Sequence, residues 1–121
     1  MSTTSLLEEL SEFDLPLWAG LDPAARLELQ SKLQRIVLPG GEVLFREGDP
    51  ADVLYMLVSG ALGVSVQGDH GEQRRIARIA PSETIGEMAL ISNAPRSATV
   101  TALRDSVLLT LARADFESLI E

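Results

Sequence analysis

The chain has 121 residues, of which 45% are hydrophobic and 23% charged, as expected for one ordinary globular domain. Its 18 acidic residues against 10 Lys and Arg give a net charge of −8, which disfavours non-specific nucleic-acid binding because such binding depends on basic side chains. The lack of cysteine excludes disulfides, thiol catalysis and Cys-bound metals. The lack of cysteine also fits a cytoplasmic protein, which is expected here. No signal peptide and no apolar run of the ~20 residues that span a membrane is visible.

Helical patterns come first along the chain. Residues 5–13 carry leucines and a phenylalanine at helical spacing and predict a short amphipathic helix. Asp22 followed by Pro23 predicts the start of a second helix, which is expected to end near Lys32. Residues 1–34 are therefore expected to form an N-terminal helical segment.

After this segment the sequence changes to short β-rich runs separated by glycine or proline turns. Such runs at regular spacing favour a β-sandwich or barrel over a parallel sheet with crossover helices. Residues 35–112 are expected to form this barrel, and residues 113–121 the start of a C-terminal helix. The expected strands lie at 35–38, 42–45, 53–59, 61–67, 73–79, 97–103 and 107–111.

One stretch, residues 85–100, interrupts the strand pattern and carries the polar chemistry. Its first part predicts a one- or two-turn helix, whose start presents unpaired N–H groups and a positive dipole end. Arg96 and Ser97 follow in the same loop, and together with the helix start they predict a site for a phosphate group. Because a carboxylate repels phosphate, Glu87 is expected to accept a hydrogen bond from a hydroxyl of the sugar that carries the phosphate.

Residues 86–90 (GEMAL) and 94–100 (APRSATV) resemble the phosphate-binding cassette of cyclic nucleotide-binding domains. These domains occur in catabolite-activator-type regulators, protein kinase A regulatory subunits and gated channels. Residues 39–49 resemble the early strand–turn signature of the family, and residues 54–60 resemble its central strand, which ends in glycine.

The resemblance implies a mainly β fold, an eight-stranded jelly-roll barrel with helices at both ends. It also implies a regulatory module that binds a 3′,5′-cyclic nucleotide, cAMP in preference to cGMP. By resemblance, Arg96 pairs with the cyclic phosphate, Glu87 accepts from the ribose 2′-OH, and Gly86 allows close approach. The remaining implied contacts are N–H groups around Met88, Ala89 and Ser97, and Val64 and Thr99 beside the base.

The closing segments, residues 97–106 and 112–116, look most like domains fused to bacterial patatin-like phospholipases of the neuropathy-target-esterase type. This likeness implies a covalently attached effector domain beyond Glu121, which the ligand would control by shifting the helices that flank the barrel.

A second hypothesis keeps the fold but makes the domain a docking or dimerisation module. The apolar side of the last helix, with Phe116, Leu119 and Ile120, would then form the interface of a homodimer. A metal-dependent enzyme is disfavoured, because the chain has a single histidine and no familiar catalytic motif, so no metal, prosthetic group or enzymatic activity is expected. The basic residues of strand 73–79 (Arg74, Arg75, Arg78) fit a solvated strand face better than a surface for an acidic partner.

Overall fold

The computed structural model describes residues 22–85 and 94–120. The helix predicted at 5–13 and the short helix predicted at 86–91 lie outside this range. The described part begins with helix α3 (Pro23–Lys32) and ends with helix α5 (Arg113–Ile120). Between them lie the strands β1 (Gln34–Leu38), β2 (Val43–Phe45), β3 (Val53–Ser59), β4 (Leu62–Gln67), β5 (Gln73–Ile79), β6 (Thr84–Ile85), β7 (Thr99–Ala102) and β8 (Ser106–Ala112).

Helix α3 begins where the sequence predicted it. The side chain of Asp22 accepts a hydrogen bond from the N–H of Ala25 at 2.7 Å, and Pro23 occupies the first turn, where its missing N–H costs nothing. The helix ends at Lys32, and the N–H of the following residue, Leu33, donates to the carbonyl groups of Leu29 and Gln30. None of the described helices is both long and apolar enough to cross a membrane.

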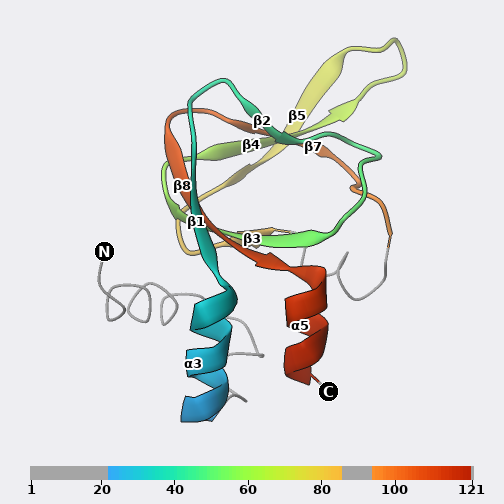
Figure 1. Cartoon of the computed structure of the whole chain (residues 1–121). Helices are drawn as coiled ribbons and strands as arrows, with labels where there is room; N and C mark the ends of the chain where they lie inside the picture. Colours follow the sequence, from blue (N-terminus) through green and yellow to red (C-terminus); the bar gives the residue numbers. More distant parts are fainter. Residues whose placement is uncertain (1–21, 86–93, 121) are drawn as a thin grey trace.

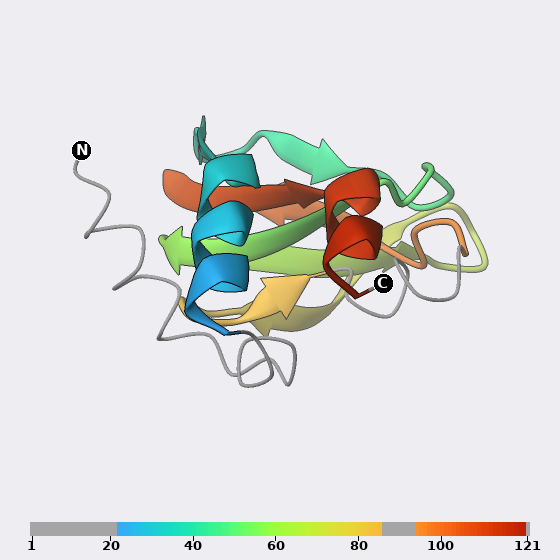
Figure 2. The ribbon, with the colours of Figure 1, turned by 60° about the horizontal axis from the view of Figure 1, so that its bottom comes forward.

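The strands form two antiparallel four-stranded sheets, one in the order β1-β8-β3-β6 and the other in the order β2-β7-β4-β5. Figure 1 shows the sheets stacked face to face, with the β4–β5 hairpin projecting to one side. Helices α3 and α5 contact each other and lie side by side beneath the first sheet (Figures 1 and 2). This arrangement confirms the predicted mainly β barrel with flanking helices.

The core between the sheets is built from the alternate residues that each strand turns inward. Leu57 and Leu108 come from one sheet, Leu62 and Val100 come from the other, and each is at most 2% exposed. Leu54, which is also fully buried, neighbours Tyr55 and therefore faces the opposite side of β3. Strand β3 is thus buried on both faces, as its continuous apolar sequence requires.

A glycine fixes the turn between β3 and β4. Gly60 has a φ of 102°, and a Cβ at this position would lie 2.6 Å from the Cα of Ser106. The hydroxyl of Ser106, a buried polar group, accepts a hydrogen bond from the N–H of Ala61. The glycine that ends the central strand therefore permits the close approach of β8.

The expected strands agree with the observed ones to within about two residues at each end, an uncertainty that is usual for element ends. The exception is β6, which has only two residues and pairs with Tyr55 and Met56 of β3. Two residues carry no alternation pattern, so β6 was not predicted from the sequence.

Candidate functional site

The residue predicted to bind phosphate, Arg96, is one of the few buried polar residues of the described part, with 5% of its surface exposed. Its backbone is fixed by two hydrogen bonds to the turn after β2. The N–H of Arg96 donates to the carbonyl of Asp49, and the N–H of Gly48 donates to the carbonyl of Arg96, both at 2.8 Å. The backbone of the loop is therefore held in place independently of the arginine side chain.

The guanidinium of Arg96 lies at the end of the core, in contact with both sheets. Its carbon is 4.2 Å from the ring centroid of Phe45 on β2 and 5.6 Å from that of Tyr55 on β3. The two rings are stacked on each other with centroids 5.9 Å apart. Nη2 donates to the carbonyl of Val53 at 2.6 Å. Aromatic faces attract a cation, so this arrangement fixes the plane and direction of the guanidinium.

Two nitrogens of this guanidinium, Nε and Nη1, are buried and have no hydrogen-bond partner among the described residues. Burial lowers the pKa of Arg96, and the neighbouring Tyr55, Asp52 and Asp49 act in the opposite direction. No described carboxylate forms an ion pair with this guanidinium. A buried cation with two unpaired donors is costly unless an anion completes it. The arrangement therefore leaves two nitrogens of a buried cation available to donate to an anion.

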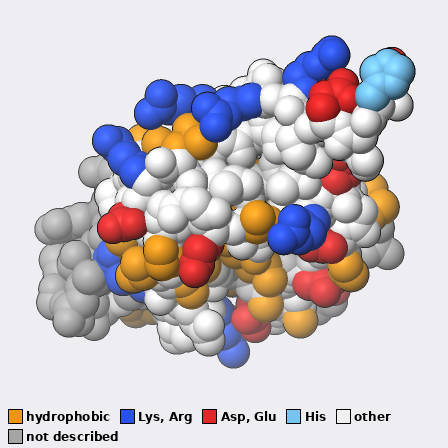
Figure 3. Space-filling model, turned by 90° about the horizontal axis from the view of Figure 1, so that it is seen from above, with side chains coloured by type: hydrophobic (Ala, Val, Ile, Leu, Met, Phe, Trp, Pro, Cys, Tyr) orange, Lys and Arg blue, Asp and Glu red, His pale blue; other side chains and the backbone are white. Residues whose placement is uncertain are grey.

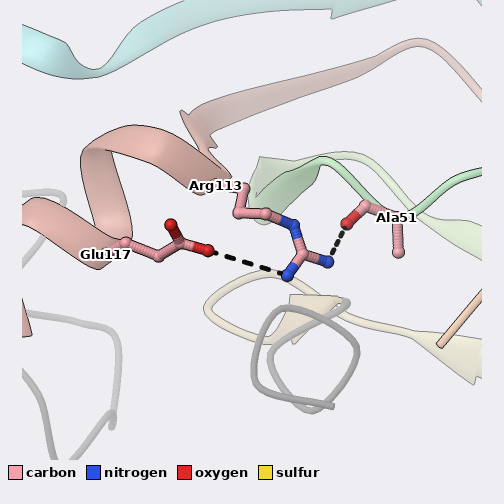
Figure 4. Close-up of polar contacts among 3 residues, drawn as sticks. All are labelled: Ala51, Arg113 and Glu117. Carbon is pink, nitrogen blue, oxygen red and sulfur yellow. Dashed lines mark hydrogen bonds and ion pairs between the residues drawn. The ribbon is translucent and has the colours of Figure 1, made fainter. Parts of the chain in front are cut away.

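A second guanidinium lies nearby and was not identified from the sequence. Arg113, at the start of α5, donates through Nη2 to the carbonyl of Ala51 at 2.7 Å, and its Nη1 lies 3.9 Å from a carboxylate oxygen of Glu117 (Figure 4). The N–H of Arg113 also donates to the carbonyl of Asp52 at 2.7 Å. Its positive charge contributes to the lowered pKa of Arg96. Arg113 thus connects α5 to the segment that leads into β3, next to the carbonyl that Arg96 holds.

The other predicted site residues are only partly brought together. Val64 is opposite Val100 in the β4–β7 register and packs against the inter-sheet core. Thr99 is opposite Ser65, so it faces the outer side of the sheet, where its hydroxyl accepts from the N–H of Glu47 at 3.0 Å. The structure therefore does not bring Thr99 together with Val64 beside a ligand.

Ser97 is exposed and follows the buried Arg96 in the chain. The remaining predicted contacts, Gly86, Glu87, Met88 and Ala89, lie outside the described residues. The rings of Phe45 and Tyr55 were also missed from the sequence, because their apolar context indicates core packing and nothing in it points to the arginine.

The comparison with known proteins agrees with this geometry. The family described as the cyclic nucleotide-binding domain matches residues 35–121. The chain belongs to this family. It is 35% identical over 102 residues to the cAMP-dependent protein kinase regulatory subunit of Dictyostelium discoideum, covering 82% of this chain and 31% of that protein. It is 36% identical over 105 residues to the cyclic AMP receptor protein of Thermus thermophilus, covering 87% of this chain and 49% of that protein.

Solved structures show the same fold. The regulatory domain of Toxoplasma gondii PKA, crystallised with cAMP, superposes with a TM-score of 0.87 at 32% identity, over 97% of this chain and 44% of that chain. The catabolite activator protein of Thermus thermophilus superposes with a TM-score of 0.75 at 37% identity, over 88% and 50% of the two chains. This chain therefore spans half or less of the length of these relatives. By family and fold this chain is a cyclic nucleotide-binding domain, and its similarity extends to kinase regulatory subunits and receptor proteins.

Proposed function

We propose that the chain binds a 3′,5′-cyclic nucleotide, cAMP in preference to cGMP, and thereby regulates an attached effector domain. The observation that carries the proposal is the buried guanidinium of Arg96, with Nε and Nη1 unpaired among the described residues. The exocyclic oxygens of a cyclic phosphate are acceptors for these unpaired donors, and charge-assisted hydrogen bonds between guanidinium and phosphate are among the strong ones.

The contacts of the rest of the nucleotide are proposed from the resemblance to the cyclic nucleotide-binding family. Glu87 accepts from the ribose 2′-OH, and Gly86 leaves room for the sugar. The N–H groups of Met88, Ala89 and Ser97 surround the phosphate, and Val64 supplies an apolar contact for the base. Because the molecule as a whole has a net charge of −8, the attraction for the anion has to come from this local arrangement.

The connection between the site and α5 supports a regulatory role. Arg96 holds the carbonyl of Val53, while Arg113 holds those of Ala51 and Asp52. A ligand that shifts the guanidinium of Arg96 would therefore also shift residues 51–53, the segment that is hydrogen-bonded to α5 through Arg113. In this proposal residues 35–112 form the ligand-binding barrel and residues 113–121 begin the helix that reports occupancy to the effector. A patatin-like phospholipase is the effector that the resemblance of the closing segments favours.

The experiment combines a ligand lacking one group with a variant lacking its partner. We expect cAMP to raise the melting temperature of the chain, and adenosine, which has no phosphate, to leave it unchanged. Removing the ribose hydroxyl, in 2′-deoxy-cAMP, should weaken binding to the unmodified chain but make little difference in Glu87→Ala, which has no side-chain acceptor. A melting temperature that neither cAMP nor cGMP changes, with a dimer that forms as the concentration rises, would replace the sensor by the docking or dimerisation module.

A further inference from the structure

The outer face of the β2-β7-β4-β5 sheet, which faces away from the core, carries a hollow of about 360 Å³. Its walls include the side chains of Arg46, Arg75, Ser65 and Thr101. Gly63 lines the hollow without a side chain. A Cβ at this position would lie 2.9 Å from a methyl carbon of Leu103 and 3.2 Å from Nε of Arg75. The absence of a side chain at Gly63 therefore lets Arg75 lie across the hollow.

The same face concentrates unneutralised positive charge. Arg78 is opposite Gly63 in the β4–β5 register, so it shares this face with Arg75, which is opposite Ser65. Arg46, Arg75 and Arg78 are all exposed, and within the described ranges none of them forms an ion pair with a carboxylate. In a chain with a net charge of −8, such a cluster is unexpected. Figure 3, which views the molecule from above, shows several basic side chains along one border of this face and another nearer its middle, with acidic side chains elsewhere on the same view.

Strand β5 also has an unused edge. It is the last strand of its sheet and, among the described strands, pairs only with β4. Six of its seven residues are exposed, and Ile76, at a register shift, is 57% exposed. An edge strand presents a row of backbone donors and acceptors that can pair with another extended segment. Pairing of two copies of β5 would bring like charges together, which disfavours a second copy of this chain as the occupant.

We propose that β5 and the hollow beside it form a docking surface for an acidic, extended segment of another protein. Such a segment would add a strand to the edge of β5. Its alternate side chains would then lie on the outer face, where carboxylates reach Arg75 and Arg78. Ile76 supplies an apolar contact between the two charges.

A nucleic acid fits this surface less well than an acidic peptide. Single-stranded nucleic acids are held largely by stacking of their bases on aromatic side chains. The rings of Phe45 and Tyr55 belong to the core and stack with Arg96 instead, and no aromatic residue of the described part lines the hollow. The net charge of −8 also repels a phosphate backbone. The docking surface lies on the face of the sheet opposite Val64 and Val100, so it does not depend on the proposed nucleotide site.

The test is a fluorescence anisotropy titration at low salt with three labelled peptides. The first alternates Glu with Thr or Val, the second has Gln in place of every Glu, and the third is the acidic peptide with alternate backbone nitrogens methylated. We expect only the first to bind, and Arg75→Glu combined with Arg78→Glu to weaken it by about tenfold. The control Lys32→Glu, which matches each single reversal, Arg75→Glu or Arg78→Glu, in charge but lies on exposed α3, should leave the affinity unchanged.

The proposal is overturned if the acidic peptide does not bind, or if the Gln peptide binds equally well. It is also overturned if a single-stranded oligonucleotide of similar length binds more tightly, since this would assign the surface to nucleic acid. Should the double variant fail to fold, the comparison of the three peptides on the unmodified chain still decides the question. None of these outcomes bears on cAMP binding, because Arg75 and Arg78 are not among the residues proposed to contact the nucleotide.

Discussion

Replacing Arg96 by methionine tests how much of the ligand affinity comes from one buried guanidinium. Methionine keeps an unbranched stem of comparable reach and removes every N–H of the head group. In the ligand complex, Nε and Nη1 would each donate one charge-assisted hydrogen bond, and these are worth about 1.5–3 kcal/mol each. The loss of both amounts to about 3–6 kcal/mol, which corresponds to a roughly hundredfold to ten-thousandfold weaker cAMP complex.

The stability of the ligand-free protein should change far less. The substitution removes the hydrogen bond to the carbonyl of Val53 and the contact with the ring of Phe45, which both stabilise the fold. It also removes a buried cation with two unpaired nitrogens, which destabilises the fold. These contributions have opposite signs, so the free energy of unfolding should change by no more than about 2 kcal/mol.

Isothermal titration calorimetry with cAMP measures the first quantity, and urea unfolding without ligand measures the second. Arg46→Met is the matched control, because it makes the same chemical change at an exposed arginine on the outer face of the barrel. It should bind cAMP as the unmodified chain does. If Arg96→Met binds cAMP within about threefold of the unmodified chain, which is under 1 kcal/mol, the reasoning from unpaired nitrogens is wrong.

Three further predictions follow from other parts of the molecule. Burial raises the pKa of Tyr55 above 10.0 and Arg96 opposes this, so the ultraviolet titration of the only tyrosine should have its midpoint above 10.0 and move higher still in Arg96→Met. Because the pKa of Tyr55 is higher in the folded state, its contribution to stability is complete below pH 10.0 and is lost as the pH rises through the folded pKa. Tyr55→Phe should therefore reduce the fall in melting temperature at alkaline pH. An unchanged fall would contradict the raised pKa of Tyr55. Leu57→Ala should lower the free energy of unfolding by about 2–5 kcal/mol in urea, whereas Leu27→Ala, at a side chain that is 59% exposed, should change it by less than about 0.5 kcal/mol. Gly60→Ala should lower the free energy of unfolding in urea by more than the ~1–2 kcal/mol that a left-handed residue costs, because its Cβ would lie 2.6 Å from a backbone carbon. A smaller decrease would show that the turn can relax.

Local patterns determined much of this fold before any tertiary contact was considered. Asp22 and Pro23 specify the start of α3 through bonds within one turn of chain. Alternating residues in β4 mark its inner and outer faces, and Gly60 marks the end of β3. These features depend on neighbours only a few residues apart, so they can be read from the sequence without the fold. Strand β6 is too short to carry such a pattern, and its existence depends on pairing with β3.

The candidate site divides in the same way. The residue types around Arg96 were enough to predict an anion site, because few other arrangements place a guanidinium beside small residues and a helix start. Its burial between Phe45 and Tyr55, and its bond to the carbonyl of Val53, join segments up to 51 residues apart in the chain. Only the packing of the two sheets brings these groups together.

The outward direction of Thr99 and the bond of Arg113 to Ala51 were likewise decided by the tertiary structure. The side of a sheet on which a residue lies depends on its register with the neighbouring strand, and a shift of one residue reverses it. Likewise, the partner of an arginine at a helix start depends on which loop packs against that helix. The sequence alone thus determined most of the strands, the turns and the position of the charge that we propose binds the ligand. The tertiary structure decided which groups surround that charge, because those groups come from distant segments that meet only in the folded barrel.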